Sequence, residues 1–311
     1  RAEYSHRKGE QKATGFTLEK DYFYLYPSAN LSWSFTDLLQ LQLNYSRRVD
    51  RPYKWYLNPR TDYSDSTRVY VGNPNLTPEF ANSYEVGLMV NLGFITVTPS
   101  IFYRNEIDVI SPINTYVGTT RYYEFVNVAK GENYGGEMSI QANPAMWWMN
   151  SIDVSYYRQT IDNPVSVSES TNDTYSWSAR YMGMFNFSFS AFGLDNQMLS
   201  AQIMANYMPG AVTPQGKRDD FFMVDLGLRH QFTRSFSMSL RISDIFNNIK
   251  WGGESFGENY KLYSKYHHNQ RGINIGFTYK LREETDRERR GGNRGGGMQG
   301  GGGGAPAGGG I

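Results

Sequence analysis

The sequence contains no cysteine among its 311 residues. Without thiols, the chain has neither a disulfide framework nor thiolate chemistry. It also lacks long apolar runs: its mean hydropathy is −0.58, and no stretch approaches the roughly 18 apolar residues that a membrane-spanning helix needs. Opposite charges nearly cancel, to a net charge of +1, which gives no reason to expect nucleic acid as a partner. These absences exclude a helical membrane protein but not a β-barrel, whose strands are apolar only at alternate positions.

Aromatic residues are abundant, at 15% of the chain, and many lie in segments where every second residue is apolar. In the last such segment, Ile273, Ile275 and Phe277 alternate with Asn274 and Gly276. This period of two is typical of a β-strand with one apolar face. It predicts about twelve strands and no helix, near residues 2–6, 29–35, 41–49, 84–92, 95–103, 138–142, 152–156, 173–190, 199–205, 222–228, 236–242 and 273–281.

The connections between these segments alternate between short and long. Short turns are expected near residues 36–38, 91–94, 143–146, 192–196 and 233–235, and long polar loops near 9–21, 51–80, 110–120, 161–173, 208–219 and 248–264. Short periplasmic turns and long extracellular loops are typical of outer-membrane barrels. The sequence therefore predicts an all-β fold, an antiparallel transmembrane β-barrel whose interior is lined by polar residues such as Gln42 and Arg241. A soluble carbohydrate-binding β-protein remains an alternative, because alternation by itself also suits a half-solvated sheet.

Seven motifs occur in one order along the chain: YSRRVDRP (45–52), LNPR (57–60), GNPNLTPEFANSYEVGL (72–88), SIFYRNEIDVI (100–110), ENYGGEMSI (132–140), SDIFNN (243–248) and RGINIGFTYKL (271–281). Together they resemble the barrel of TonB-dependent outer-membrane receptors, within which the likeness is to the Bacteroidota-type outer membrane β-barrel family. The resemblance implies a complete barrel of about 22 strands that encloses an N-terminal plug. It also implies energy coupling through TonB and the proton-motive force.

On this resemblance, residues 1–281 are the C-terminal part of a larger barrel, with the plug and TonB box expected upstream of Arg1. Residues 282–311 are rich in arginine and glycine, a composition that cannot bury a core, and are expected to form a disordered periplasmic tail. An alternative for the tail is a cell-wall or partner-binding arm.

The implied function is import of a nutrient, such as a ferric siderophore, cobalamin or a glycan, across the outer membrane of a Gram-negative cell. The implied partners are outer-membrane lipid, the plug, TonB, an extracellular small molecule and the barrel-assembly machinery. The alternative function is a barrel with a structural, adhesive or secretion-related role and no active import.

The sequence offers no catalytic or metal-binding motif. His267 and His268 lack further ligands at fixed spacing, and no serine nucleophile motif is present, so we expect no enzyme activity and no cofactor. Aromatic and cationic side chains in two loops suit a bulky, polar or anionic ligand; the alternative is that they pack the loops against their neighbours. In SDIFNN, Asp244 and Phe246 are expected to fix the end of a strand. The candidate substrate-binding residues are Arg51, Tyr53, Trp55, Tyr56, Arg60, Arg68, Tyr70, Trp251 and Tyr260.

Overall fold

The computed structural model describes residues 1–12, 15–161, 173–191, 193–257, 260–267, 269 and 271–281. No helix among these residues is long and apolar enough to cross a membrane. The described residues form nineteen strands: β1 (Ala2–Gln11), β2 (Phe16–Leu25), β3 (Ser28–Ser34), β4 (Leu39–Asp50), β5 (Asp62–Asp65), β6 (Arg68–Val71), β7 (Glu79–Asn91), β8 (Ile95–Val117), β9 (Thr120–Ala145), β10 (Trp148–Ile161), β11 (Asp173–Ala191), β12 (Leu194–Met208), β13 (Val212–Thr213), β14 (Gly216–Arg218), β15 (Phe221–Gln231), β16 (Phe236–Ser243), β17 (Lys250–Gly257), β18 (Tyr260–His267) and β19 (Gly272–Tyr279).

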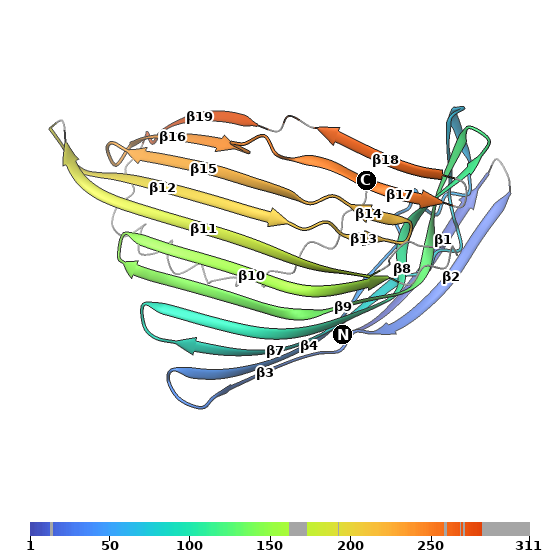
Figure 1. Cartoon of the computed structure of the whole chain (residues 1–311), viewed down its shortest axis with the longest axis horizontal. Coiled ribbons are helices and arrows are strands. Elements are labelled where there is room, and N and C mark those ends of the chain that lie inside the picture. Colours follow the sequence, from blue (N-terminus) through green and yellow to red (C-terminus); the bar gives the residue numbers. More distant parts are fainter. Residues whose placement is uncertain are drawn as a thin grey trace.

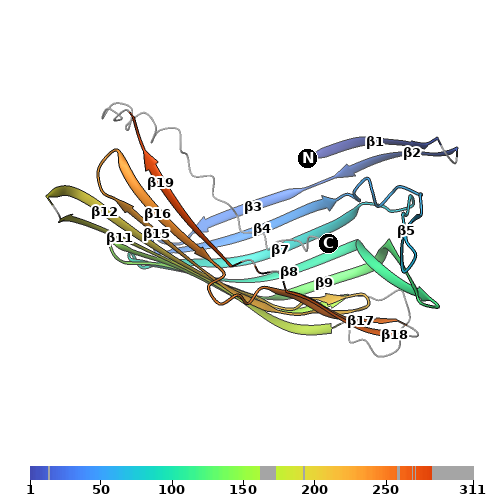
Figure 2. The ribbon, with the colours of Figure 1, turned by 90° about the horizontal axis from the view of Figure 1, so that it is seen from above.

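One sheet forms a continuous wall in which β19, β16, β15, β12, β11, β10, β9, β8, β7, β4 and β3 are hydrogen-bonded in that order. Neighbouring strands of the wall are antiparallel. The wall curves into a trough, with the short turns at one end and the long connections at the other (Figures 1 and 2). We call these the short-turn end and the long-loop end. The predicted all-β antiparallel fold is confirmed.

The register keeps apolar residues on one face of the wall. Ile275 pairs with Leu240, Leu240 with Leu228, and Leu228 with Ala201. This face is not buried between layers, since Ile275 is 58% exposed and Phe277 68% exposed. A soluble sandwich would bury such a face, whereas a membrane barrel turns it to lipid.

The opposite face of the wall is polar over many register positions. Arg241 pairs with Asn274 on one side and Gly227 on the other, and Gly227 pairs with Gln202. Arg241 also donates to the Asp225 carboxylate at 3.2 Å. The two faces therefore have the chemistry of a barrel with a lipid-facing outside and a polar interior.

Aromatic side chains gather at both ends of the apolar face. At the long-loop end, Tyr45, Tyr84, Tyr103 and Tyr134 occupy one register row across four strands. The Tyr45 and Tyr84 rings stack with centroids 4.8 Å apart. At the short-turn end, Trp147 stacks with neighbouring aromatic rings on β10 and β11. Two aromatic rows flanking an apolar band are the girdles of a transmembrane barrel.

Each of the twelve predicted strands corresponds to a strand of the structure, but three predicted long loops are wrong. Residues 9–21 belong largely to the β1–β2 hairpin, which is paired from Ala2 to Gln11. Residues 110–120 continue β8 and begin β9, with only Gly118 and Thr119 between them. Residues 248–264 are mostly β17 and β18. Polar residues interrupt the apolar alternation in these extensions, as Lys20 and Asp21 do in β2, because beyond the membrane both faces of a strand can be polar. Residues 162–172 of the predicted 161–173 loop, and the 282–311 tail, lie outside the described residues.

Candidate ligand-binding site

The 51–80 loop folds around a small aromatic core at the long-loop end. Tyr56 is only 6% exposed and stacks on Phe125 of β9 with ring centroids 3.6 Å apart. Leu76 is completely buried in the same cluster, and Tyr70 and Tyr123 pack against it. Tyr70 lies on β6, which pairs in parallel with β9. This core gives the loop a fixed conformation, so its exposed side chains project from a built surface.

The GNPNLTPEF segment is tied to the rest of this end by asparagine side chains. Asn73 Nδ2 donates to the Phe125 carbonyl at 3.0 Å. Asn127 Oδ1 accepts from the Thr77 N–H at 2.9 Å, and its Nδ2 donates to the Thr77 carbonyl at 3.0 Å. At Gly72 a Cβ would lie 1.7 Å from the Asn58 carbonyl oxygen, so only glycine permits this approach. The prolines thus lie in an irregular but hydrogen-bonded loop that leads into β7.

The candidate residues of this loop divide into buried and exposed groups. Tyr56 and Tyr70 belong to the packed core, which suits the packing role. Tyr53 and Trp55 are 63% and 51% exposed at its surface. Arg68 holds its guanidinium 5.9 Å from the Tyr123 ring centroid. Arg60 is exposed, and its backbone N–H donates to Asn58 Oδ1. Trp55 and Arg68 are therefore the members of this set best placed to meet a ligand.

The two candidates from the 248–264 segment lie on different strands. Trp251 of β17 is 44% exposed, with its ring 5.1 Å from that of Phe221. Tyr260 of β18 donates its hydroxyl to the Asn114 carbonyl at 3.1 Å, and its ring lies 4.5 Å from that of Tyr116. Tyr260 thus fastens β18 to β8, and Trp251 is the more accessible of the pair.

A glutamine that the sequence does not single out joins the same region. Gln215 is 5% exposed; its Oε1 accepts from the Asn114 N–H at 2.7 Å, and its Nε2 donates to the Asn114 carbonyl at 2.9 Å. Arg121 Nε donates to Asn114 Oδ1 at 2.7 Å. These bonds connect the β13–β14 turn to the β8–β9 extension. Because the two partners are about a hundred residues apart and follow no motif, no signal in the sequence could have paired them.

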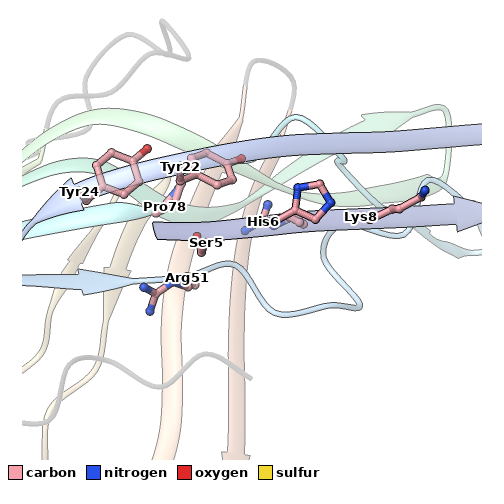
Figure 3. Close-up of a pocket in the computed structure, with 8 residues that line it drawn as sticks. Ser5, His6, Lys8, Tyr22, Tyr24, Arg51 and Pro78 are labelled. Carbon is pink, nitrogen blue, oxygen red and sulfur yellow. The ribbon is translucent and has the colours of Figure 1, made fainter. Parts of the chain in front are cut away.

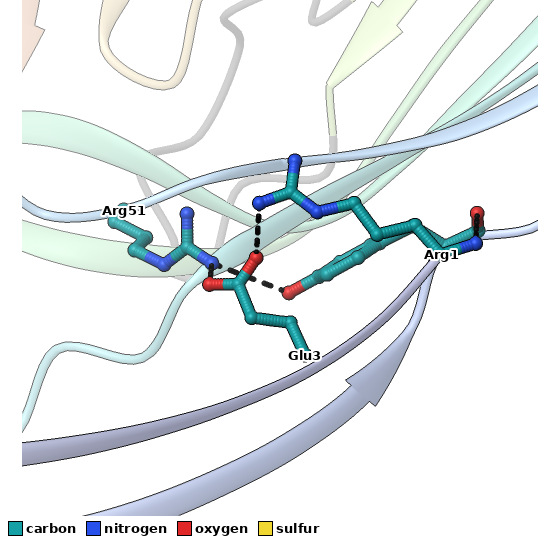
Figure 4. A network of polar contacts seen from close by, with 4 residues as sticks. Arg1, Glu3 and Arg51 are labelled. Atoms are coloured by element: carbon teal, nitrogen blue, oxygen red, sulfur yellow. Dashed lines mark hydrogen bonds and ion pairs between the residues drawn. The ribbon is translucent and has the colours of Figure 1, made fainter.

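Arg51 lies at a cavity of about 300 Å³ between the β1–β2 hairpin and the beginning of the 51–80 loop (Figure 3). Its guanidinium is ion-paired with Glu3, whose other carboxylate oxygen accepts from Arg1 at 2.7 Å (Figure 4). The sequence singles out no binding residue in the hairpin, since residues 9–21 are predicted to form a loop. The cavity is lined by Ser5, His6, Arg7, Lys8, Tyr22, Tyr24, Arg51 and Pro78.

Glu79 is the first residue of β7 and lies outside the lipid-facing apolar row that begins at Tyr84; its carboxyl group is partly buried. Burial raises the pKa of Glu79 to about 7, and the neighbouring carboxylates of Glu106 and Asp50 add to the rise. The Ile110 N–H donates to Glu79 Oε2 at 2.9 Å and acts in the opposite direction. The protonated form is therefore favoured in the folded state below about pH 7.

Replacing Glu79 with glutamine is expected to remove a pH-dependent loss of stability. Since the folded-state pKa lies above the unfolded one, Glu79 stabilises the fold below the unfolded pKa of about 4.3. That stabilisation is lost as pH rises through about 7. Glu79→Gln keeps an oxygen for the Ile110 N–H but cannot ionise. Thermal unfolding should give the same midpoint for both proteins at about pH 3.5, below both pKa values, and a higher midpoint for Glu79→Gln at pH 8; a wild-type advantage at pH 8 would contradict this.

The side chains at the long-loop end are of the kinds that bind a ligand non-covalently. Among the described residues, no three histidine, aspartate or glutamate side chains gather in a geometry that could hold a metal ion. His268 lies outside those residues. What the long-loop end presents instead is exposed aromatic rings and guanidinium groups on a fixed support. Such groups hold a ligand by stacking and charge-assisted hydrogen bonds.

Comparison with solved structures gives the same architecture. The ferric yersiniabactin uptake receptor FyuA from Yersinia pestis matches over 89% of this chain and 41% of its own, with a TM-score of 0.57 and 12% identity. The FrpB iron transporter from Neisseria meningitidis (F3-3 variant) matches over 89% of this chain and 42% of its own, with a TM-score of 0.52 and 15% identity. At such low identity these likenesses show the fold alone.

Comparison of sequences identifies the family. The vitamin B12 transporter BtuB of Vibrio vulnificus (strain YJ016) is 26% identical over 196 residues, which are 61% of this chain. The chain spans 28% of the length of that curated relative. The model of the outer membrane protein beta-barrel family matches residues 1–279. The chain belongs to this family, and its strands lie in the outer membrane.

Proposed function

We propose that this chain forms part of the barrel of a TonB-dependent receptor that imports a nutrient such as a ferric siderophore, cobalamin or a glycan. The observation that carries the proposal is the division of one wall into an exposed apolar face and a polar face. At its long-loop end the wall carries aromatic and cationic side chains that the packed loop core holds in place. Uptake or transport in the names of the similar proteins supports the same function. In this proposal the protein binds and passes its ligand without covalent chemistry.

The same proposal covers the larger barrel, the plug, the TonB box and the position of residues 282–311. Residues 1–281 contribute strands to a larger barrel, and the plug and TonB box lie on sequence outside this chain. β19 runs toward the short-turn end (Figure 1), which supports a periplasmic position for residues 282–311. We further propose that the barrel-assembly machinery inserts the barrel into the membrane.

Among the candidate residues, the exposed ones are proposed to meet the ligand first. Tyr53, Trp55 and Trp251 are each at least 44% exposed, and stacking on such rings contributes to affinity. Tyr56 and Tyr260 are proposed to act indirectly, by holding the loop core and the β18–β8 contact. Arg60 is proposed to add positive charge at the edge of the ligand-binding surface.

Uptake by a strain that lacks the complete gene tests the proposal. Radiolabelled cobalamin, ferric siderophores and oligosaccharides are supplied to the wild type, the deletion strain and a strain without TonB. Import of at least one probe is expected to fall to background in both mutants, because transport needs the barrel and its energy source. If every probe enters the deletion strain as fast as the wild type, import is refuted and the structural, adhesive or secretion-related barrel is favoured.

A further inference from the structure

The cavity at the β1–β2 hairpin presents hydrogen-bond donors without a carboxylate in its lining. Its volume is about 300 Å³, which is at the lower end for small-molecule sites. Basic nitrogen atoms come from His6, Arg7, Lys8 and Arg51, and the lining contains no aspartate or glutamate. Figure 3 shows His6 and Lys8 on β1 and Arg51 just after the end of β4. A concave surface of this composition favours an acceptor-rich ligand.

Two acidic groups near the cavity are paired with its cations. Glu3 is ion-paired with both Arg1 and Arg51. Asp21 lies 2.8 Å from His6 Nδ1. These contacts offset part of the charge of Arg51 and His6. They leave Arg7 and Lys8 as the cations that a ligand would meet.

Arg7 is held in position by neutral partners. Its Nη1 donates to the Leu76 carbonyl at 3.5 Å, and its guanidinium lies 5.3 Å from the Tyr22 ring centroid. Within the described part of the chain, no carboxylate lies within ion-pairing distance of Arg7. A positioned guanidinium without a carboxylate can still form the two-pronged bond that carboxylates and phosphates accept.

Tyr22 forms a fixed aromatic wall of the cavity. Its hydroxyl is buried and has no hydrogen-bond partner in the described residues, although buried polar groups are almost always paired. The ring itself is fixed, since it stacks on Tyr24 with centroids 5.8 Å apart, and Tyr24 meets Phe80 edge-on at 4.7 Å. The Arg47 guanidinium lies over the Phe80 ring, 4.9 Å from its centroid. Within the described residues the Arg47 Nε is likewise buried and has no hydrogen-bond partner.

We propose that this cavity binds a small molecule through an oxyanion, a carboxylate or phosphate group held by Arg7. Lys8 raises the local positive potential, and the Tyr22 and Tyr24 rings give the ligand an apolar wall. The ligand comes either from solution or from a lipid headgroup at the outer leaflet. The claim that the bound molecule is an imported nutrient rests on the proposed function. The claim that the cavity binds an oxyanion does not depend on import.

Calorimetric titration of the complete, detergent-solubilised receptor tests the site, with citrate and inorganic phosphate as probes. Arg7→Gln is expected to weaken binding about tenfold or more, because it removes a charge-assisted bond. Tyr22→Phe keeps the ring and removes only a hydroxyl that is closed off from the cavity, so it is expected to change affinity less than about twofold. Lys20→Gln is the matched control: Lys20 pairs with Arg7 in register but does not line the cavity, and its loss is expected to change affinity less than about twofold.

Each outcome of the titration supports or overturns the proposed oxyanion site. Absence of citrate and phosphate binding by the wild type overturns the proposal, as does equal binding by Arg7→Gln and Lys20→Gln. Repeating the titration in nanodiscs with and without lipid A distinguishes the sources: competition by lipid A assigns the oxyanion to a headgroup, and unchanged binding assigns it to a free solute. Circular dichroism checks that each variant is folded. Probe binding needs no energy coupling, so binding without TonB-dependent uptake refutes only import. Uptake without oxyanion binding refutes only the site.

Discussion

Replacing Ile152 with arginine is expected to destabilise the folded protein in lipid by about 2–4 kcal/mol, the cost of a cation on the lipid face near the bilayer midplane. Ile152 lies on the apolar face of β10, where it pairs with Ile140 and Tyr181. It is halfway between Trp148 and Tyr156, which lie at opposite ends of that face. No polar group of the interior can reach the arginine there without rotating the strand.

The neighbouring residue provides the control for this prediction. Ser151 is on the polar face and pairs with Gln141 and Met182, so Ser151→Arg should cost far less than Ile152→Arg. Urea unfolding of the complete protein in lipid vesicles, followed by tryptophan fluorescence, measures both. Equal destabilisation by the two substitutions would contradict the assignment of the faces.

Replacing Asp244 with alanine is expected to destabilise the fold by about 3 kcal/mol, because two N–H groups lose their acceptor where water is largely excluded. Asp244 is 1% exposed. Its carboxylate accepts from Asn248 N–H at 3.0 Å and Ile249 N–H at 3.3 Å. Its backbone has φ of 45°, a region that aspartate and asparagine tolerate better than alanine. The expected role of Asp244 in fixing the end of a strand therefore has a direct physical basis.

Asp244→Asn separates the two contributions. Asparagine keeps one acceptor oxygen and the tolerance for positive φ, so its cost should be clearly smaller than that of alanine. Phe246→Leu is a second comparison, since Phe246 is 61% exposed and meets Phe222 only at 6.3 Å between centroids. Guanidinium unfolding curves of the three variants test the order. If Asp244→Ala unfolds at the wild-type midpoint, the capping role is wrong.

The strands of the wall were predictable because each has one face toward an apolar surrounding. Ile273, Ile275 and Phe277 alternate with polar residues in the sequence, and the structure places all three on the exposed apolar face. The extensions beyond the wall were missed for the converse reason. In the β1–β2 hairpin, Lys8 pairs with Glu19 and Arg7 with Lys20, so polar residues occupy both faces and interrupt the apolar alternation.

The candidate site was only partly predictable. Composition correctly indicated aromatic and cationic residues at the long-loop end, and Arg51 does line a cavity. It could not distinguish Tyr56, which is buried against Phe125, from Trp55, which is half-exposed. It also could not bring Arg7 and Tyr22 to Arg51, because that meeting depends on how the hairpin packs against the 51–80 loop.

By itself, the order of residues determined the strand period, the chemistry of the two faces and the membrane setting, since these follow from contacts between a residue, its immediate neighbours and solvent or lipid. Only the tertiary structure decided which loop aromatics are packed, which polar side chains join distant segments, and where Arg7, Tyr22 and Arg51 surround a cavity. Those features depend on register and on loop closure between segments far apart in the chain, and neither leaves a local periodic signal.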